Sequence, residues 1–135
     1  MRFLLLVKSN GEAETGAMPD EKMLTAMTKY NEELAKAGVL LDLSGLQPTS
    51  KGVRVTFSGN KRTVTDGPFT EAKELVAGYW LIETKSKEEA IEWVKRVPFE
   101  EGEVEVRQLF ELDDFEPGEA IDRARKLEEY LANKK

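Results

Sequence analysis

The order in which strand-like and helical patterns follow one another constrains the fold of this chain more than any other feature. Residues 2–8 are apolar on both alternating faces, which is typical of an inner strand covered on each side. The polar segment 10–18 predicts a loop, and residues 20–37 repeat apolar side chains at the spacing of one helical face. Residues 39–43 predict a second strand, so the first part of the chain is expected to be β-α-β.

The same order recurs after a β-hairpin. Alternating residues on either side of Gly59-Asn60 predict two short strands joined at that turn, and Asp66-Gly67-Pro68-Phe69 is expected to break the ladder. The remaining elements are expected as a strand at 75–84, a helix capped by Ser86 and Glu89 and ended by Pro98, a strand at 103–110, and an amphipathic helix after Gly118.

This order indicates an α+β fold of the ferredoxin-like type, with two split βαβ halves around one mostly antiparallel sheet and an inserted hairpin. Helices are expected to cover one face of the sheet. The opposite face also carries apolar residues, and a second subunit is the natural cover, so we expect a homodimer. We expect residues 1–112 to form the domain and residues 113–135 to be a C-terminal amphipathic helix packed on it.

Composition limits the class of protein. A chain of 135 residues with 40% hydrophobic and 34% charged residues predicts one globular domain rather than a disordered or membrane-spanning segment. The apolar run before Lys8 is too short for a bilayer span or a signal-peptide core, so no membrane association is expected. The chain has no cysteine, which fits a reducing compartment, and the expected location is the cytoplasm.

The missing histidine and cysteine also limit the chemistry. General acid or base catalysis would need a shifted carboxylate, lysine or tyrosine, and transition metals lose their usual ligands, so no metal and no cofactor is expected. The net charge of −6 argues against nucleic-acid binding. The exception is a basic cluster on the predicted hairpin, interpreted as a solvated surface that protects a sheet edge; it comprises Lys51, Arg54, Lys61 and Arg62.

Four motifs in a fixed order resemble the DGPF branch of the YCII-related proteins. They are Gly45-Leu46-Gln47-Pro48, Asp66-Gly67-Pro68-Phe69-Thr70-Glu71-Ala72-Lys73-Glu74, Gly78-Tyr79-Trp80-Leu81-Ile82 and Val104-Glu105-Val106-Arg107. The resemblance implies a dimeric α+β barrel of ferredoxin-like subunits and says little about activity. Some relatives are linked to sigma factors, which implies a regulatory role in transcription initiation. Others carry a histidine and aspartate pair and look like cofactor-free enzymes, including a dehydrochlorinase of chlorinated aromatics.

This sequence departs from the second group of relatives. The histidine would fall near Met27 and the aspartate at Val97, so a histidine and aspartate mechanism is not carried over.

Several residues in these motifs are candidates for a cleft. Asp66 is a candidate base, a ligand contact or an acceptor for the amides of its own turn, the last being a frequent use of aspartate before glycine. Tyr79 and Trp80 are adjacent on a strand, so one is expected in the core and the other in a pocket or dimer contact. Arg107 is expected to bind a carboxylate ligand or, more often in such settings, to pair with Asp66. Lys73 and Glu74 belong to a charged run that is usually solvated and are candidates only because the family motif includes them.

Three functions remain open on this evidence. The first is a dimeric protein that binds a small organic molecule, or a cofactor-free enzyme of unassigned reaction. The second is a regulatory module that contacts a sigma factor, and the third is a structural dimer without a ligand. A deep pocket with polar anchors would favour the first, and a cleft filled entirely by side chains would favour the third.

Overall fold

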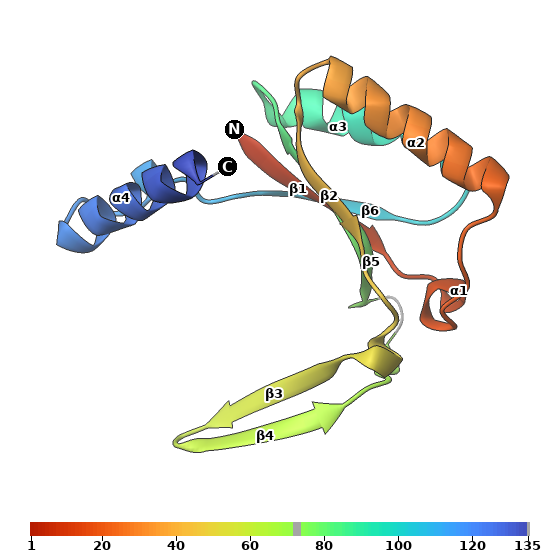
Figure 1. The fold of residues 1–135 in the computed structure, drawn as a ribbon, viewed down its shortest axis with the longest axis horizontal. Helices are drawn as coiled ribbons and strands as arrows, with labels where there is room; N and C mark the ends of the chain where they lie inside the picture. Colours follow the sequence, from red (N-terminus) through yellow and green to blue (C-terminus); the bar gives the residue numbers. More distant parts are fainter. Residues whose placement is uncertain (72–73, 135) are drawn as a thin grey trace.

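Four antiparallel strands form the central sheet, in the order β2-β5-β1-β6 (Figure 1). The computed structural model describes residues 1–71 and 74–134. The strands are β1 (Arg2–Lys8), β2 (Leu40–Gly45), β3 (Val53–Ser58), β4 (Lys61–Asp66), β5 (Val76–Glu83) and β6 (Val104–Gln108). The helices are α1 (Gly11–Glu14), α2 (Glu21–Lys36), α3 (Lys87–Lys95) and α4 (Glu119–Asn133), with short 3-10 turns η1 (Thr49–Lys51) and η3 (Leu112–Asp114).

The topology is that of a ferredoxin-like fold. The units β1-α2-β2 and β5-α3-β6 each join two strands that are not neighbours, and β1 and β5 lie together in the middle of the sheet. The predicted α+β class and the split βαβ arrangement are therefore confirmed. The hairpin β3-β4 turns at Gly59-Asn60 as predicted and forms a two-stranded sheet of its own.

The core lies between one face of the sheet and the helices α2 and α3 (Figure 1). Alternate residues of β1 and β5 point into it, because side chains on a strand face opposite sides in turn. The expected coverage of one face by helices is confirmed. The fully or nearly fully buried members are Phe3, Leu5, Tyr30, Leu34, Val39, Trp80, Ile82 and Ala90.

Local hydrogen bonds explain where the two core helices begin. The Asp20 carboxylate accepts a hydrogen bond from the Met23 amide at 2.8 Å, which satisfies one of the free N–H groups at the start of α2. Ser86 Oγ accepts from the Glu89 amide at 3.2 Å at the start of α3, as the predicted cap requires. Gly38, with φ of 75°, follows the end of α2 in the left-handed conformation that favours glycine.

The predicted loop at 10–18 is wrong in part, because residues Gly11–Glu14 form the one-turn helix α1. The Asn10 side chain accepts from the Ala13 amide at 2.9 Å, and the Thr15 hydroxyl donates to the Glu12 carbonyl at 2.7 Å. These side-chain bonds hold a turn that has no apolar periodicity and buries no residue, so hydrophobic patterning could not indicate it.

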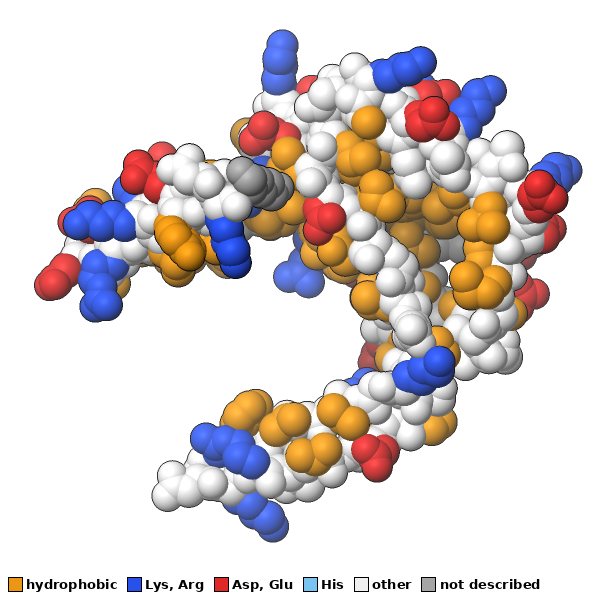
Figure 2. Space-filling view, viewed as in Figure 1, with side chains coloured by type: hydrophobic (Ala, Val, Ile, Leu, Met, Phe, Trp, Pro, Cys, Tyr) orange, Lys and Arg blue, Asp and Glu red, His pale blue; other side chains and the backbone are white. Residues whose placement is uncertain are grey.

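Two segments extend away from α2 and α3 and border a hollow. Figure 1 shows the hairpin β3-β4 on one side and α4 on the other, with the sheet between them, and Figure 2 shows the hollow that they enclose. No described residue of the hairpin strands or of α4 is buried. The packing of residues 113–135 on the domain stays a prediction. No described helix is long and apolar enough to cross a membrane.

Tyr30 provides a test of the core by pH. Its hydroxyl donates to the Trp93 carbonyl at 2.7 Å, and burial raises the pKa of Tyr30 to about 12. Because the unfolded chain then loses this proton near pH 10 and the folded chain retains it, stability is full below pH 10 and is lost as the pH rises towards 12. We expect the free energy of unfolding to fall by roughly 2–3 kcal/mol over that interval, as measured by urea denaturation.

The Tyr30→Phe variant should lose this alkaline component, at a cost of about 1 kcal/mol at neutral pH from the missing hydrogen bond. Equal alkaline slopes for the wild type and Tyr30→Phe would contradict the assignment.

Candidate functional site

The face of the sheet opposite the helices carries a mixed set of polar and apolar side chains. Leu4 and Leu6 on β1 and Leu81 on β5 alternate with the core residues and are only half-buried. Cross-strand pairing places the residues of this face in two rows. One row is Asp42, Leu81, Leu4 and Arg107, and the other is Ser44, Tyr79, Leu6 and Glu105. We call this surface the open face; it has an apolar centre and polar borders.

Asp42 and Tyr79 form one border of the open face. The Tyr79 hydroxyl donates to Asp42 Oδ2 at 3.0 Å, and this hydrogen bond raises the pKa of Tyr79 above its usual value. The phenol therefore stays protonated at neutral pH. Because the one phenol proton is donated to Asp42, the carboxylate and the phenol oxygen together present hydrogen-bond acceptors to a small molecule.

Two cations and one carboxylate form the opposite border. Lys8 Nζ lies 3.1 Å from Glu105 Oε1, and Arg107 Nε lies 3.7 Å from Glu105 Oε2. The Arg107 side chain is 69% exposed, so its guanidinium retains donors for a planar anion such as a carboxylate. The expected pairing of Arg107 with Asp66 is not among the ion pairs found within the described part of one chain.

Asp66 is the last residue of β4 and pairs with Val53 at the base of the hairpin. Its carboxylate is exposed, and no hydrogen bond from the described amides of its own turn reaches it. The turn is held instead by its neighbours, because Gly67 N donates to the Gly52 carbonyl at 3.0 Å and Phe69 N donates to Thr49 Oγ1 at 3.0 Å. The DGPF turn is thus a backbone attachment of the hairpin to η1.

A shallow open pocket of about 230 Å³ lies beside this turn. The Arg54 guanidinium lies over the Phe69 ring at 3.7 Å from its centroid, which is a cation–π contact. Thr49 Oγ1 donates to Glu14 Oε2 at 2.5 Å and so joins α1 to the same turn. The pocket is lined by Arg54, Pro68, Phe69, Thr70, Glu71, Glu74 and Leu75.

The structure separates the residues that the sequence analysis grouped together. Tyr79 and Arg107 lie on the open face, whereas Asp66 and Glu74 lie near the base of the hairpin. Trp80 points into the core, with 3% of its surface exposed, and its Nε1 donates to Asn31 Oδ1 at 2.7 Å. Trp80 is thus the aromatic residue in the core, and the pocket or dimer contact expected for its neighbour Tyr79 stays a prediction. Lys73 lies outside the described residues.

Sequence reasoning missed three members of the open face. Lys8 and Glu105 could have been found by continuing the alternation from Leu4 and Leu6 and from Arg107. Asp42 could not, because a register shift between Leu40 and Asp42 changes the face on which it lies. No group of three or more potential metal ligands occurs within residues 1–71 and 74–134.

A family model of the YCII-related domain matches residues 1–113. The chain belongs to the YCII-related family. An uncharacterised protein of Rhizobium meliloti (strain 1021) is 30% identical over 89 residues, covering 64% of this chain and 72% of that protein. A solved structure, 5-chloro-2-hydroxyhydroquinone dehydrochlorinase (TftG) from Burkholderia phenoliruptrix AC1100 in complex with 2,5-dihydroxybenzoquinone, is similar with a TM-score of 0.42 and 16% identity. That similarity covers 82% of this chain and 94% of that one.

This YCII-related protein has apolar side chains where the resemblance would place a histidine and an aspartate. Met27 and Val97 both pack against the buried core and are partly buried themselves. Neither position faces the open side of the sheet with its polar groups. Any chemistry of this protein therefore depends on groups other than that pair.

Proposed function

We propose that this YCII-related protein is a homodimer that binds a small organic molecule at the open face of its sheet, as a binding protein or as a cofactor-free enzyme. The observation that carries the proposal is the arrangement of the open face. Its apolar centre of Leu4, Leu6 and Leu81 lies between the hydrogen-bonded Asp42 and Tyr79 and the charged Glu105 and Arg107. An apolar surface with a few convergent polar groups has the composition that is typical of ligand sites.

In this proposal a second copy encloses the open face. The core helices α2 and α3 cover the other face of the sheet. Figure 2 shows a hollow between the hairpin and α4. The exposed side chains of Phe57 on the hairpin and Leu127 on α4 add apolar surface to the two segments that border the hollow. An isolated two-stranded ribbon is marginally stable in water, which also favours a covering partner. The expected assembly is a dimeric α+β barrel with the two open faces towards each other.

The polar borders define the class of ligand. The exposed guanidinium of Arg107 suits a carboxylate, which it can bind through two parallel hydrogen bonds. The Asp42 carboxylate and the Tyr79 oxygen are acceptors in this arrangement and suit a hydroxyl group at the other end of the molecule. The leucine side chains suit an apolar ring between the two. Small aromatic carboxylates and phenols fit this description.

The enzyme version of the proposal assigns proton transfer to the same groups. Tyr79 stays protonated at neutral pH, because its hydroxyl is bonded to Asp42 and its pKa is raised, so it is not the base. Asp42 and Glu105 are the carboxylates on the open face that can accept a proton from a bound molecule. Asp66 is the further candidate from the sequence, at the hairpin base.

The oligomeric state is the first test. We expect light scattering to give a mass near twice 15.2 kDa at micromolar concentration, because the single chain leaves its open face and both bordering segments uncovered. A monomer under those conditions would contradict the proposal.

The ligand class is tested by thermal shift with benzoates, phenols and lactones, since a molecule that binds only the folded state raises its melting temperature. Removal of a charge-assisted hydrogen bond costs about 1.5–3 kcal/mol, so Arg107→Met should weaken carboxylate binding by roughly 10- to 100-fold. Arg96→Met is the matched control, because Arg96 pairs with Glu33 on the helices at 2.7 Å. The proposal fails if no compound stabilises the protein or if Arg107→Met and Arg96→Met behave alike.

A further inference from the structure

The hairpin β3-β4 is an amphipathic ribbon whose apolar face has no cover in the single chain. Cross-strand pairs share a face, so one side of the ribbon carries the apolar side chains together with Arg62 and Asp66, and the other side is polar. The apolar members are Val53, Val55, Phe57 and Val64, and the polar side carries Arg54, Thr56, Ser58, Lys61, Thr63 and Thr65. The four apolar side chains are 46–68% exposed. Figure 2 shows hydrophobic side chains along the edge of the hairpin that borders the hollow.

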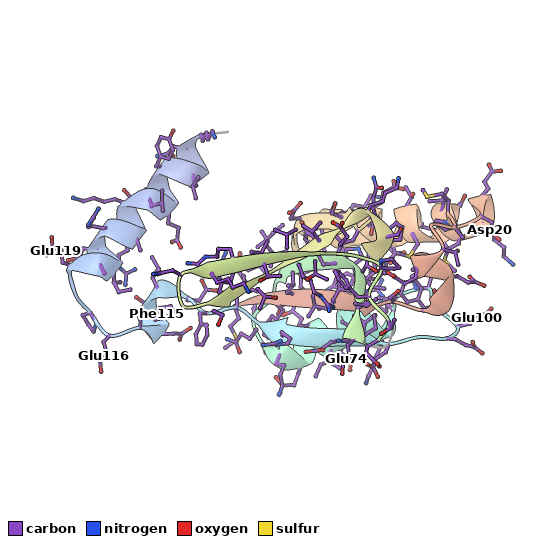
Figure 3. The ribbon with its side chains drawn as sticks, turned by 90° about the horizontal axis from the view of Figure 1, so that it is seen from below. Asp20, Glu74, Glu100, Phe115, Glu116 and Glu119 are labelled. Carbon is purple, nitrogen blue, oxygen red and sulfur yellow. The ribbon has the colours of Figure 1, made fainter. Side chains whose placement is uncertain are left out.

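Helix α4 is the other uncovered element on the hollow. Its apolar stripe includes Leu127, Tyr130 and Leu131, which are 54–63% exposed. The segment from Leu109 to Gly118, which we call the elbow, joins β6 to α4 and contains the exposed aromatic pair Phe110 and Phe115, with ring centroids 5.3 Å apart. Figure 3 shows Phe115, Glu116 and Glu119 at one end of the molecule, on the elbow and at the start of α4.

The elbow is fixed in place by ion pairs to the rest of the chain. Arg2 Nη2 lies 2.9 Å from Glu111 Oε1, which joins the elbow to β1, and Arg125 Nη2 lies 2.5 Å from Asp113 Oδ1, which joins it to α4. The Glu111 amide donates to Asp114 Oδ2 at 2.7 Å. The elbow and α4 therefore present a defined surface, and Glu116 and Glu119 remain exposed on it.

The hairpin and the elbow have opposite charge, whereas α4 after Asp122 is mixed, with Arg123, Arg125 and Lys126 beside Glu128 and Glu129. Residues 51–65 contain four basic residues and no acidic one, namely Lys51, Arg54, Lys61 and Arg62. Residues 109–122 contain no lysine or arginine, and their acidic residues are Glu111, Asp113, Asp114, Glu116, Glu119 and Asp122. Contact between two hairpins would place like charges together, and so would contact between two elbows. Contact between a hairpin and an elbow would pair opposite charges.

We propose that each hairpin of the dimer packs its apolar face against the elbow and α4 of the other copy. The proposal rests on the homodimer proposed above and selects one of the two ways in which a two-fold axis can bring the bordering segments together. In the proposed arrangement the two-fold axis brings each hairpin to the α4 of the partner. In the alternative arrangement it brings the two hairpins together and the two α4 helices together. The basic cluster then has a partner within the dimer, and the open face is closed at both borders by segments of two chains.

The salt dependence of the wild-type dimer tests the proposal without any substitution. Opposite charges across the interface are screened as salt rises, so the dissociation constant should increase by about tenfold or more between 50 mM and 500 mM NaCl in analytical ultracentrifugation. Contacts between like segments predict the reverse, a dimer that tightens with salt, and that result would overturn the proposal. A wild type that is monomeric in all conditions would instead overturn the proposed function itself.

Charge reversal at the two segments gives the sharper test. We expect Lys61→Glu with Arg62→Glu to raise the dissociation constant at least about tenfold, and Glu116→Lys with Glu119→Lys to do the same. The four substitutions in one chain should restore it to within about threefold of the wild type, because the opposite charges again face each other. Circular dichroism of each variant checks that its secondary structure is retained.

Lys22→Glu with Lys29→Glu is the matched control, since both residues are exposed on α2 and the change in net charge equals that of the hairpin variant. The control should leave the dissociation constant unchanged. Reversals that leave the dimer intact, or a combined variant no tighter than either parent, would overturn the proposed contact while leaving the homodimer standing.

Discussion

Gly67→Ala is expected to detach the base of the hairpin from η1 and to cost about 3 kcal/mol or more in the free energy of unfolding. A Cβ at position 67 would lie 1.8 Å from the Thr49 carbonyl oxygen and 2.7 Å from its carbon. Both are backbone atoms, so no side-chain rotation can relieve the overlap. Separation of the two segments also breaks the hydrogen bonds from Gly67 N to Gly52 O and from Phe69 N to Thr49 Oγ1.

Urea denaturation measures the global loss, and hydrogen exchange at the Phe69 amide reports the local detachment. Gly45→Ala is the matched control, because a Cβ at that position meets nothing within 4 Å. Both glycines belong to the motifs that carry the family resemblance. The comparison therefore shows whether the loss of stability comes from the overlap of a Cβ with the Thr49 backbone or from any change in such a motif. Equal stability of the two variants would show that the turn is not attached in this way.

The strands and core helices were predictable because their signal is local. A strand repeats every two residues and a helix every 3.6, so the buried faces of β1 and α2 can be read from the chain. The same alternation predicted that Tyr79 and Trp80 lie on opposite faces of the sheet. The order of the elements then left few arrangements for the sheet, of which the observed β2-β5-β1-β6 is one.

The site was less predictable because it depends on irregular geometry. Strict alternation from Leu40 places Asp42 on the helix side of the sheet, whereas the register shift after Leu40 aligns it with Leu81 on the open face, next to Tyr79. The DGPF sequence predicted an interruption of the ladder but not that Thr49 would be the residue it packs against. The uncovered apolar faces of the hairpin and α4 were also not predictable in full. The sequence pattern shows that these faces are apolar, but it does not show what covers them.

The second large effect is expected for Trp80→Ala, which should lower the free energy of unfolding by about 4 kcal/mol. Trp80 contacts the Tyr30 ring edge-on, with centroids 5.4 Å apart, and lies 6.5 Å from the Phe99 centroid. Its removal leaves a cavity between the sheet and α2, and it takes away the Nε1 donor that binds Asn31 Oδ1 at 2.7 Å. Both losses occur inside a single chain, so the decrease in the free energy of unfolding caused by Trp80→Ala should not depend on protein concentration.

Tyr79→Ala is the matched substitution on the other side of the same strand. The two variants compare a side chain that supports the core with one that lies on the open face. Tyr79 is half-buried and its hydroxyl bonds only to the exposed Asp42 within the described part of the chain, so the monomer should lose about 1 kcal/mol or less. In the proposed dimer the second copy covers the Tyr79 ring. The loss in the free energy of unfolding caused by Tyr79→Ala should therefore vary with protein concentration, because dissociation is linked to unfolding. Urea denaturation followed by circular dichroism at two protein concentrations separates the effects. A concentration-independent loss for Tyr79→Ala as large as that for Trp80→Ala would mean that the ring supports the fold of the single chain and not the face that the second copy covers.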